Sequence, residues 1–347
     1  MKKQIVTIAA LAMSLNMFAQ QWPVPNQEAK PGTRWWWLGS AVTENDLKWN
    51  LRQFADHGIG AIEITPIYGV QGNEKNNIPF LSPRYMDILK YVNAECKADG
   101  IEFDMATGTG WPFGGPWVPL DESASQMLII DTTVVGKKIK ALDLRPIEKK
   151  RKNTTLVGIY AFSEGKFLKI TTPLVEGTLT TKLPSKGTWR IIALYQKKGV
   201  MAVKRAAPGG AGLVIDHFDK QAVTNYLKHI EEAFEKTGTP YPHTFFNDSY
   251  EVSESDYTPT LFQEFYNRRG YSLEENFDKL VDGDTKVVAD YRETLGDMLL
   301  DNFTRTWTAW AHSHGAITRN QAHGSPANLI DCYAAVDIPE IEGFGLT

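Results

Sequence analysis

The chain has 347 residues, enough for one large barrel or two domains, and its 42% hydrophobic and 22% charged residues are ordinary for a globular protein. A formal net charge of −4, without a basic cluster that has the aromatic spacing of an RNA reader, argues against a nucleic-acid surface. The ten Trp and thirteen Tyr are compatible with stacking on sugars, although structural Trp are commoner.

The first residues, MKKQIVTIAALAMSLNMFAQ, have the pattern of a secretory signal. Lys2 and Lys3 are positive, an apolar run follows, and Ala19 is a suitable cleavage point. The run is too short to span a membrane, and no later stretch could cross a bilayer. The sequence therefore predicts a signal peptide over residues 1–19 and an exported protein without a membrane span.

Alternating strands and helices follow the signal. TRWWWLG (33–39), AIEITPI (61–67) and IEFDMATG (101–108) have the composition of strands. The two segments between them have helical spacing. Thr43 and Ser82 are their predicted caps, and Gly58 and Gly100 their ends. This spacing indicates parallel βα units.

The pattern changes over residues 121–205, which are rich in Thr, Val, Lys and Ile and have turn signals about every ten residues. No segment there has helical spacing. We therefore predict an inserted all-β domain over 121–205. We expect its lysines to lie on solvated strand faces and not to form a binding patch.

The α/β pattern resumes at GLVIDHF (212–218), with further strands expected at 243–251, 315–324 and 337–345. Helices are expected over 220–236, near 259–269 and over 286–313. Together the strands fit most of a (β/α)8 barrel of the TIM type, formed by residues 28–120 and 206–347. The alternative is an open doubly wound sheet, which is less favoured because no glycine-rich phosphate loop follows the first strand.

Polar and aromatic side chains follow the predicted strands, and in a TIM-type barrel the carboxyl ends of the strands carry the active site. Turn chemistry explains one or two such positions but not five carboxylates. Individual alternatives stay open: Glu63 can pair with an arginine, Trp111 can cap the barrel, and His323 can bond only to backbone. The candidates for substrate binding are Trp36, Trp37, Glu63, Trp111, Asp216, Asp248, Arg319 and His323.

Recurring carboxylates, many aromatics and no cofactor loop favour glycoside hydrolysis. In that reaction one carboxylic acid protonates the leaving oxygen, while a second carboxylate attacks the sugar or activates water. The sequence contains no GxSxG elbow and no HExxH motif, so neither a serine hydrolase nor a zinc hydrolase is supported.

Six segments in order, PGTRWWWLGSAVT, GIGAIEITPIYG, GTGWPFGGPWV, FFNDSYEV, TRNQAHGSP and DIPEIEGFG, resemble glycoside hydrolase family 106, the α-L-rhamnosidases. The resemblance implies a (β/α)8 catalytic domain, inversion at the anomeric carbon, and a calcium ion that contacts the sugar. It also implies a bacterial, periplasmic enzyme that removes terminal α-L-rhamnose from plant polysaccharides or glycosides.

The resemblance assigns two roles. Glu251 in DSYE corresponds to the general acid, and we expect apolar walls or a nearby carboxylate to raise its pKa so that it holds a proton. Glu340 or Glu342 in PEIEGFG corresponds to a calcium ligand, and the sequence does not separate the two.

Members of the family that this chain resembles are longer, so we expect the strand that carries the general base to be absent from these 347 residues. We therefore expect an incomplete barrel and little activity of the isolated chain. Two alternatives stay open. One is an inactive fragment or carbohydrate-binding module. The other is a retaining glycosidase of another specificity, with Glu251 and Glu340 as its pair.

Overall fold

A computed structural model of the chain describes residues 25–147 and 152–341. The predicted signal peptide and Glu342 lie outside these residues. Among the helices of the described ranges, none is both long and apolar enough to cross a membrane.

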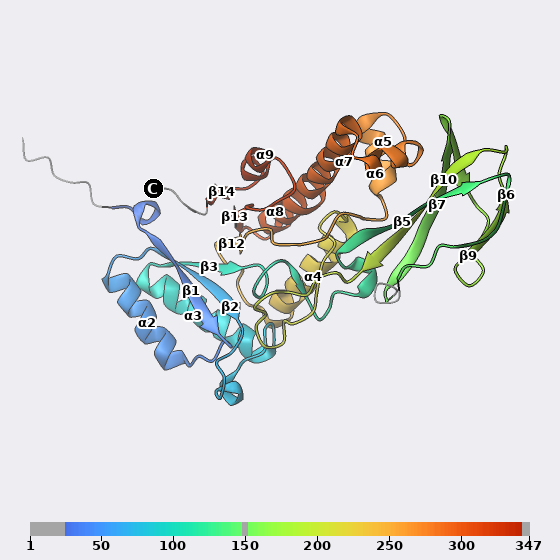
Figure 1. Ribbon diagram of the computed structural model, residues 1–347. Coiled ribbons are helices and arrows are strands. Elements are labelled where there is room, and N and C mark those ends of the chain that lie inside the picture. The colour runs from blue at the N-terminus through green and yellow to red at the C-terminus, as the bar shows by residue number, and fades with distance from the viewer. Residues whose placement is uncertain (1–24, 148–151, 342–347) are drawn as a thin grey trace, which may run out of the picture.

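Six strands form one parallel sheet, and their order in the sheet is their order along the chain (Figure 1). They are β1 (Gly32–Leu38), β2 (Ala61–Ile67), β3 (Glu102–Ala106), β12 (Thr244–Asn247), β13 (Ile317–Asn320) and β14 (Ile338–Pro339). The expected α/β architecture is therefore confirmed. The described strands form an open row with β1 and β14 at its edges, and they do not close into a barrel.

The connections between these strands are helical. Thr43 and Ser82 accept the N–H groups of Asp46 and Tyr85, and Gly100 ends its helix in the left-handed region with φ 67°, as the sequence predicts. The predicted helix over 286–313 is interrupted by a π-helical segment, η6. The helices and η6 are α2 (Glu44–Asp56), α3 (Pro83–Asp99), α4 (Lys220–Thr237), α5 (Leu261–Arg269), α6 (Phe277–Asp282), α7 (Thr285–Met298), η6 (Leu299–Thr304), α8 (Arg305–Ser313) and α9 (Leu329–Ala334).

The main core fills the space between the sheet and the helices. Because side chains alternate along a strand, Ile62 and Ile64 of β2 join this core while Glu63 points to the opposite face. Trp37 of β1 is 2% exposed and packs edge-on against Trp35 and Tyr85. One face of the sheet is thus apolar and helix-covered, which leaves the other for polar groups.

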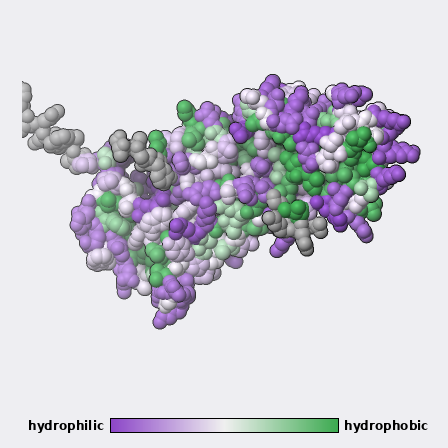
Figure 2. Space-filling model, viewed as in Figure 1, coloured by the Kyte–Doolittle hydropathy of each residue, from purple (hydrophilic) through white to green (hydrophobic). Residues whose placement is uncertain are grey.

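Residues 125–198, here called the strand-only region, contain strands and no helix in their described part. Trp189 and Ile191 belong to a second apolar core in this region. It projects away from the end of the molecule that carries α2 (Figure 1), and apolar residues gather on its visible face (Figure 2). One sheet has the order β5 (Ser125–Val135), β10 (Thr188–Lys198), β7 (Thr154–Ser163), β8 (Lys166–Ile170), and β6 (Lys138–Asp143) pairs with β9 (Thr178–Lys182).

The prediction of a sheet strand at 212–218 is wrong. Only β11 (Leu213–Val214) forms there, and it pairs antiparallel with β4 (Gly114–Gly115), outside the parallel sheet. The two backbones lie so close that a Cβ on Gly114 would stand 2.3 Å from the Leu213 carbonyl oxygen. The glycines of the loop after β3 thus permit a close backbone approach, and this segment pairs with that loop instead of with the parallel sheet.

Candidate active site

The open face of the parallel sheet carries charged side chains in place of the branched apolar residues that usually fill a barrel. Arg34, Glu63 and Asp104 stand in one register row across β1, β2 and β3. Arg319 of β13 and Glu340, just beyond β14, complete the group. Sequence alone placed Glu63 on this face, but it did not identify Arg34.

These charges form one network. Arg34 Nε lies 3.0 Å from Glu63 Oε1, and Arg34 Nη1 lies 3.1 Å from Asp248 Oδ2. Arg319 pairs with Glu63, with Asp104 at 3.6 Å and with Glu340 at 3.0 Å. Burial raises the pKa of Glu63, although both guanidinium groups oppose that shift.

An aromatic ring supports both arginines. The guanidinium carbons of Arg34 and Arg319 lie 4.5 Å and 5.0 Å from the ring centre of Phe246 on β12. Phe246 is 1% exposed, so the ring gives both cations a fixed, desolvated support. Both cations therefore gather around one ring on the open face of the sheet.

A pocket opens at the carboxyl ends of β2, β3 and β12. Trp111 and Asp248, both predicted at sequence level, line it together with Thr65, Phe246 and Asn247. Gly108 and Gly110 supply backbone in its wall. Because parallel strands present their carboxyl ends at one edge, loops distant in sequence meet here.

Glu251 lies at the rim of this edge, four residues beyond the end of β12. Its Oε2 is 2.7 Å from Lys204 Nζ, and its Oε1 accepts a hydrogen bond from Ser249 at 3.1 Å. Partial burial would raise the pKa of Glu251, but Lys204, with smaller contributions from Trp111 and Ser249, outweighs burial and lowers it. Lys204 thus replaces the apolar walls that we expected to raise this pKa, and the carboxylate is ionised in this conformation.

Sequence alone does not identify Lys204 and Arg205, because it predicts that the lysines of the inserted segment lie on solvated faces. In the structure, Lys204 and Trp111 exchange backbone hydrogen bonds of 2.8 and 3.1 Å, which brings both cations over the pocket loops. The one available signal was their position, directly before the glycine-rich AAPGGAG segment.

The other candidates lie in different settings. Trp36 is 41% exposed beside Arg34, with ring and guanidinium 5.2 Å apart. Trp37 is part of the core and offers no surface to a ligand, since period-two alternation turns it to the helices. His323 is exposed, and its carbonyl accepts the Tyr250 N–H at 2.7 Å.

Asp216 does not reach the pocket. It is 3% exposed, and its carboxylate accepts the N–H of Phe218 at 2.9 Å, just before α4. Burial raises the pKa of Asp216 to about 7. The displaced segment 212–218 explains its position, because a residue outside the parallel sheet does not end at the sheet's edge.

The described residues alone do not fit a calcium ion. No group of three or more His, Cys, Asp or Glu side chains within them is arranged to hold a metal. The Glu340 carboxylate faces Arg319 at 3.0 Å and Arg34 at 3.9 Å, so guanidinium groups stand where a cation would bind. The other predicted ligand, Glu342, lies outside the described range.

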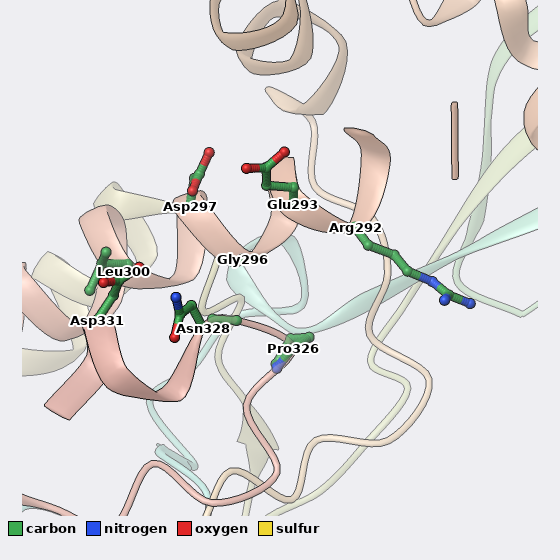
Figure 3. Close-up of a pocket in the computed structure, with 9 residues that line it drawn as sticks. Arg292, Glu293, Gly296, Asp297, Leu300, Pro326, Asn328 and Asp331 are labelled. Atoms are coloured by element: carbon green, nitrogen blue, oxygen red, sulfur yellow. The ribbon is translucent and has the colours of Figure 1, made fainter. Parts of the chain in front are cut away.

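A second hollow lies between α7, η6 and the chain before α9 (Figure 3). Glu293 and Asp297 line it, but Arg269 pairs with both, at 3.0 and 2.5 Å. None of the predicted site residues lines this hollow. The pocket at the strand ends is therefore the better candidate.

Comparison with known proteins identifies the family of the chain. The family model described as alpha-L-rhamnosidase, glycoside hydrolase family 106, matches residues 23–154 and 161–340. The chain belongs to this family. The α-L-rhamnosidase family is thus confirmed, and with it the class of glycoside hydrolases.

Individual relatives are more distant. A protein of Formosa agariphila named "Putative beta-glucuronidase" is 24% identical over 90% of this chain, which covers 31% of that protein. A solved rhamnosidase from Novosphingobium sp. PP1Y superposes with a TM-score of 0.67 at 15% identity, over 90% of this chain and 48% of its own. A β-galactosidase from Marinomonas ef1 reaches a TM-score of 0.45 at 9% identity, with 91% and 40% covered. The chain spans about a third of the curated relative and about half of the solved rhamnosidase.

Proposed function

We propose that this chain is the acid-bearing part of an exported enzyme that releases terminal α-L-rhamnose from plant glycans or glycosides with inversion. The observation that carries the proposal is the position of Glu251. Its carboxylate stands at the rim of a pocket at the strand ends, next to Trp111 and Asp248, where a glycosidic oxygen can reach it.

The sheet supports a partial (β/α)8 barrel over residues 28–120 and 206–347. In a doubly wound sheet the strand order reverses at a switch point, whereas here each new strand extends the same side. In addition, side chains of β1 and β2 contact side chains of β13 and the β14 end across the open face. Such contacts require a strongly curved sheet, as a barrel wall is.

The reaction needs a proton from Glu251. The protonated carboxyl gives this proton to the glycosidic oxygen as the bond from that oxygen to the anomeric carbon breaks. Water attacks the anomeric carbon from the opposite face as that bond breaks, and a second carboxylate takes its proton. We assign no described residue to that base.

Ligand binding must therefore change the state of Glu251. In the ligand-free structure its carboxylate is held ionised by Lys204, as the 2.7 Å contact and the lowered pKa indicate. Entry of a sugar between the two side chains would separate them and exclude water, and both changes raise the pKa of a carboxyl. Lys204 thus keeps the Glu251 carboxyl ionised in the free enzyme, and the sugar displaces Lys204 when the substrate binds.

The groups that a deoxy sugar needs lie around the carboxyl edge of the sheet. Trp111 offers an apolar ring, Asp248 accepts hydroxyl hydrogen bonds, and the exposed Trp36 ring can cover the methyl group of rhamnose. Calcium, when bound, would hold sugar hydroxyls. Arg319 and Arg34 pair with the Glu340 carboxylate. We therefore assign the role of calcium ligand to Glu342, together with further ligands outside the described residues.

The proposal is tested with Glu251→Gln, measured in the 347-residue chain and in any longer product of its gene. Gln keeps the shape but cannot donate the proton, so we expect binding of rhamnosides to persist by calorimetry. Turnover of a sugar-linked rhamnoside should fall by about 10²–10⁴-fold. The loss should be much smaller for an aryl rhamnoside whose phenolate leaves unprotonated.

Glu254→Gln, on the same loop, is the matched control and should change neither rate. An equal loss on both substrates would remove Glu251 from the acid role. Binding of rhamnosides without turnover by any form of the protein would instead support the carbohydrate-binding alternative.

A further inference from the structure

Arg205 stands at the rim of the candidate pocket, beside the proposed acid. Its guanidinium carbon lies 5.7 Å from the ring centre of Tyr68 and 5.6 Å from that of Trp111, and its Nη1 donates to the Tyr68 hydroxyl at 3.2 Å. Its carbonyl accepts the Tyr68 N–H at 3.1 Å. The loops after β2 and β3 therefore hold this side chain in place.

The charge of Arg205 is not balanced locally. Neighbouring Lys204 pairs with Glu251, and Arg34 and Arg319 are surrounded by carboxylates. Among the described residues, no carboxylate forms an ion pair with Arg205. Arg205 and Tyr68 are both exposed, so this cation is ordered by aromatic contacts and still open to solvent. A pre-positioned guanidinium loses little conformational freedom when it binds an anion.

The backbone at Arg205 is strained. Its φ is 54°, a left-handed conformation that costs energy for a residue with a Cβ. Ser40 and Ala322, which follow β1 and β13, also have positive φ, of 49° each. Strained residues thus cluster at the carboxyl edge of the sheet, where binding sites commonly hold such residues.

We propose that Arg205 binds an anionic group, a carboxylate or a sulfate ester, on the sugar to which the rhamnose is attached. This inference rests on the proposed function. Glu251 must face the glycosidic oxygen, the rhamnose lies toward Trp111 and Asp248 in the proposed function, and the exposed Arg205 follows Lys204, which contacts Glu251. The leaving sugar is therefore the part of the substrate that reaches Arg205.

The chemistry favours an anion over a neutral sugar. A guanidinium offers donors in a planar fork that matches two oxygens of a carboxylate or sulfate. The contacts with Tyr68 and Trp111 hold the guanidinium in place, and Arg205 stays exposed, so its outward N–H groups can donate to an anion. Arg205 would thus select acidic glycans without taking part in the bond cleavage.

The test measures binding, so that it does not depend on turnover. Three rhamnose-terminated disaccharides are titrated into the chain by calorimetry: one with a uronic acid as second sugar, its carboxyl-reduced neutral form, and a sulfated form of that neutral sugar. We expect one or both anionic forms to bind about tenfold more tightly than the neutral form, as expected for a charge-assisted hydrogen bond. The preferred form identifies the anion.

Arg205→Gln should abolish this preference and leave the neutral disaccharide unchanged, and raised salt should weaken only the anionic forms. Arg52→Gln, which removes one exposed charge from α2, should keep the preference. Equal binding of all three disaccharides by the unaltered chain, or a preference that survives Arg205→Gln, would overturn the inference and leave the proposed function intact. Failure to bind any of the three would overturn both.

Discussion

Arg34 of β1 and Glu340 beyond β14, on the two edge strands of the parallel sheet, approach each other to 3.9 Å between Nη2 and Oε1. A flat sheet of six strands would hold its edges about 24 Å apart, at roughly 4.8 Å per strand spacing. The sheet must therefore curve until long side chains from opposite edges meet. The same curvature lets Arg319 of β13 pair with Glu63 of β2.

This relationship predicts that Arg319→Met destabilises the fold. Glu63 is 2% exposed, and loss of one of its two cations leaves a buried carboxylate poorly compensated. We expect the free energy of unfolding, from urea titration at pH 7, to fall by about 2 kcal/mol. Arg52→Met on α2 is the surface control and should change it little.

The pH dependence of that loss follows from Glu63. Burial raises the pKa of Glu63, so its protonated form favours the folded state at low pH, and that contribution disappears as pH rises through the folded-state pKa. Removal of Arg319 raises this pKa further. The loss from Arg319→Met should therefore be smaller at pH 5 than at pH 7, and a loss independent of pH would show that Glu63 is not its cause.

Replacement of two adjacent tryptophans by alanine should have different effects. Trp37→Ala opens a cavity in the core and should reduce the free energy of unfolding by about 3–5 kcal/mol. Trp36→Ala removes a 41%-exposed ring and should leave stability nearly unchanged while it weakens rhamnoside binding. Urea titration and calorimetry on both variants check this, and a stability loss of equal size would contradict the assignment.

These two residues show what sequence could predict. Period-two alternation separates their faces, but it does not say which face packs against helices and which lies beside the charged network. The βα spacing, the helix caps and the strand-rich segment were readable because each depends on local chemistry. The displaced segment 212–218 was not, because close approach of Gly114 and Leu213 is a contact between distant parts of the chain.

The site was predictable to the same extent. Carboxylates at strand ends predict a site at the carboxyl edge of the sheet, and Asp248 and Trp111 do line one pocket there. Lys204 could not be anticipated beside Glu251, because their contact depends on how the strand-only region returns to the sheet. The assignment of Glu251 as acid, and of the domain limits, stays a prediction.

Calcium binding should depend on Glu342 and not on Glu340. Glu340 is already engaged by Arg319 and Arg34, so Glu340→Gln should leave calcium affinity unchanged. Glu342→Gln should weaken it, since a carboxylate is the ligand that Ca²⁺ prefers. Calorimetric titration of both variants with CaCl₂ measures this, and a loss of affinity in the Glu340 variant alone would reverse the assignment.

Lys204→Met should change the pH dependence of turnover. The ammonium group of Lys204 holds the pKa of Glu251 down, so its removal should raise that pKa. A general acid works only while protonated, and the alkaline limb of the kcat/KM profile for a sugar-linked rhamnoside reports its pKa in the free enzyme. This limb should move to higher pH in Lys204→Met, whereas an aryl rhamnoside should show little change.

Lys48→Met, which breaks a surface pair with Glu95, should leave the profile in place. If the limb stays fixed or moves to lower pH in Lys204→Met, then Glu251 is not the group that must be protonated, and the acid is another carboxyl of the pocket.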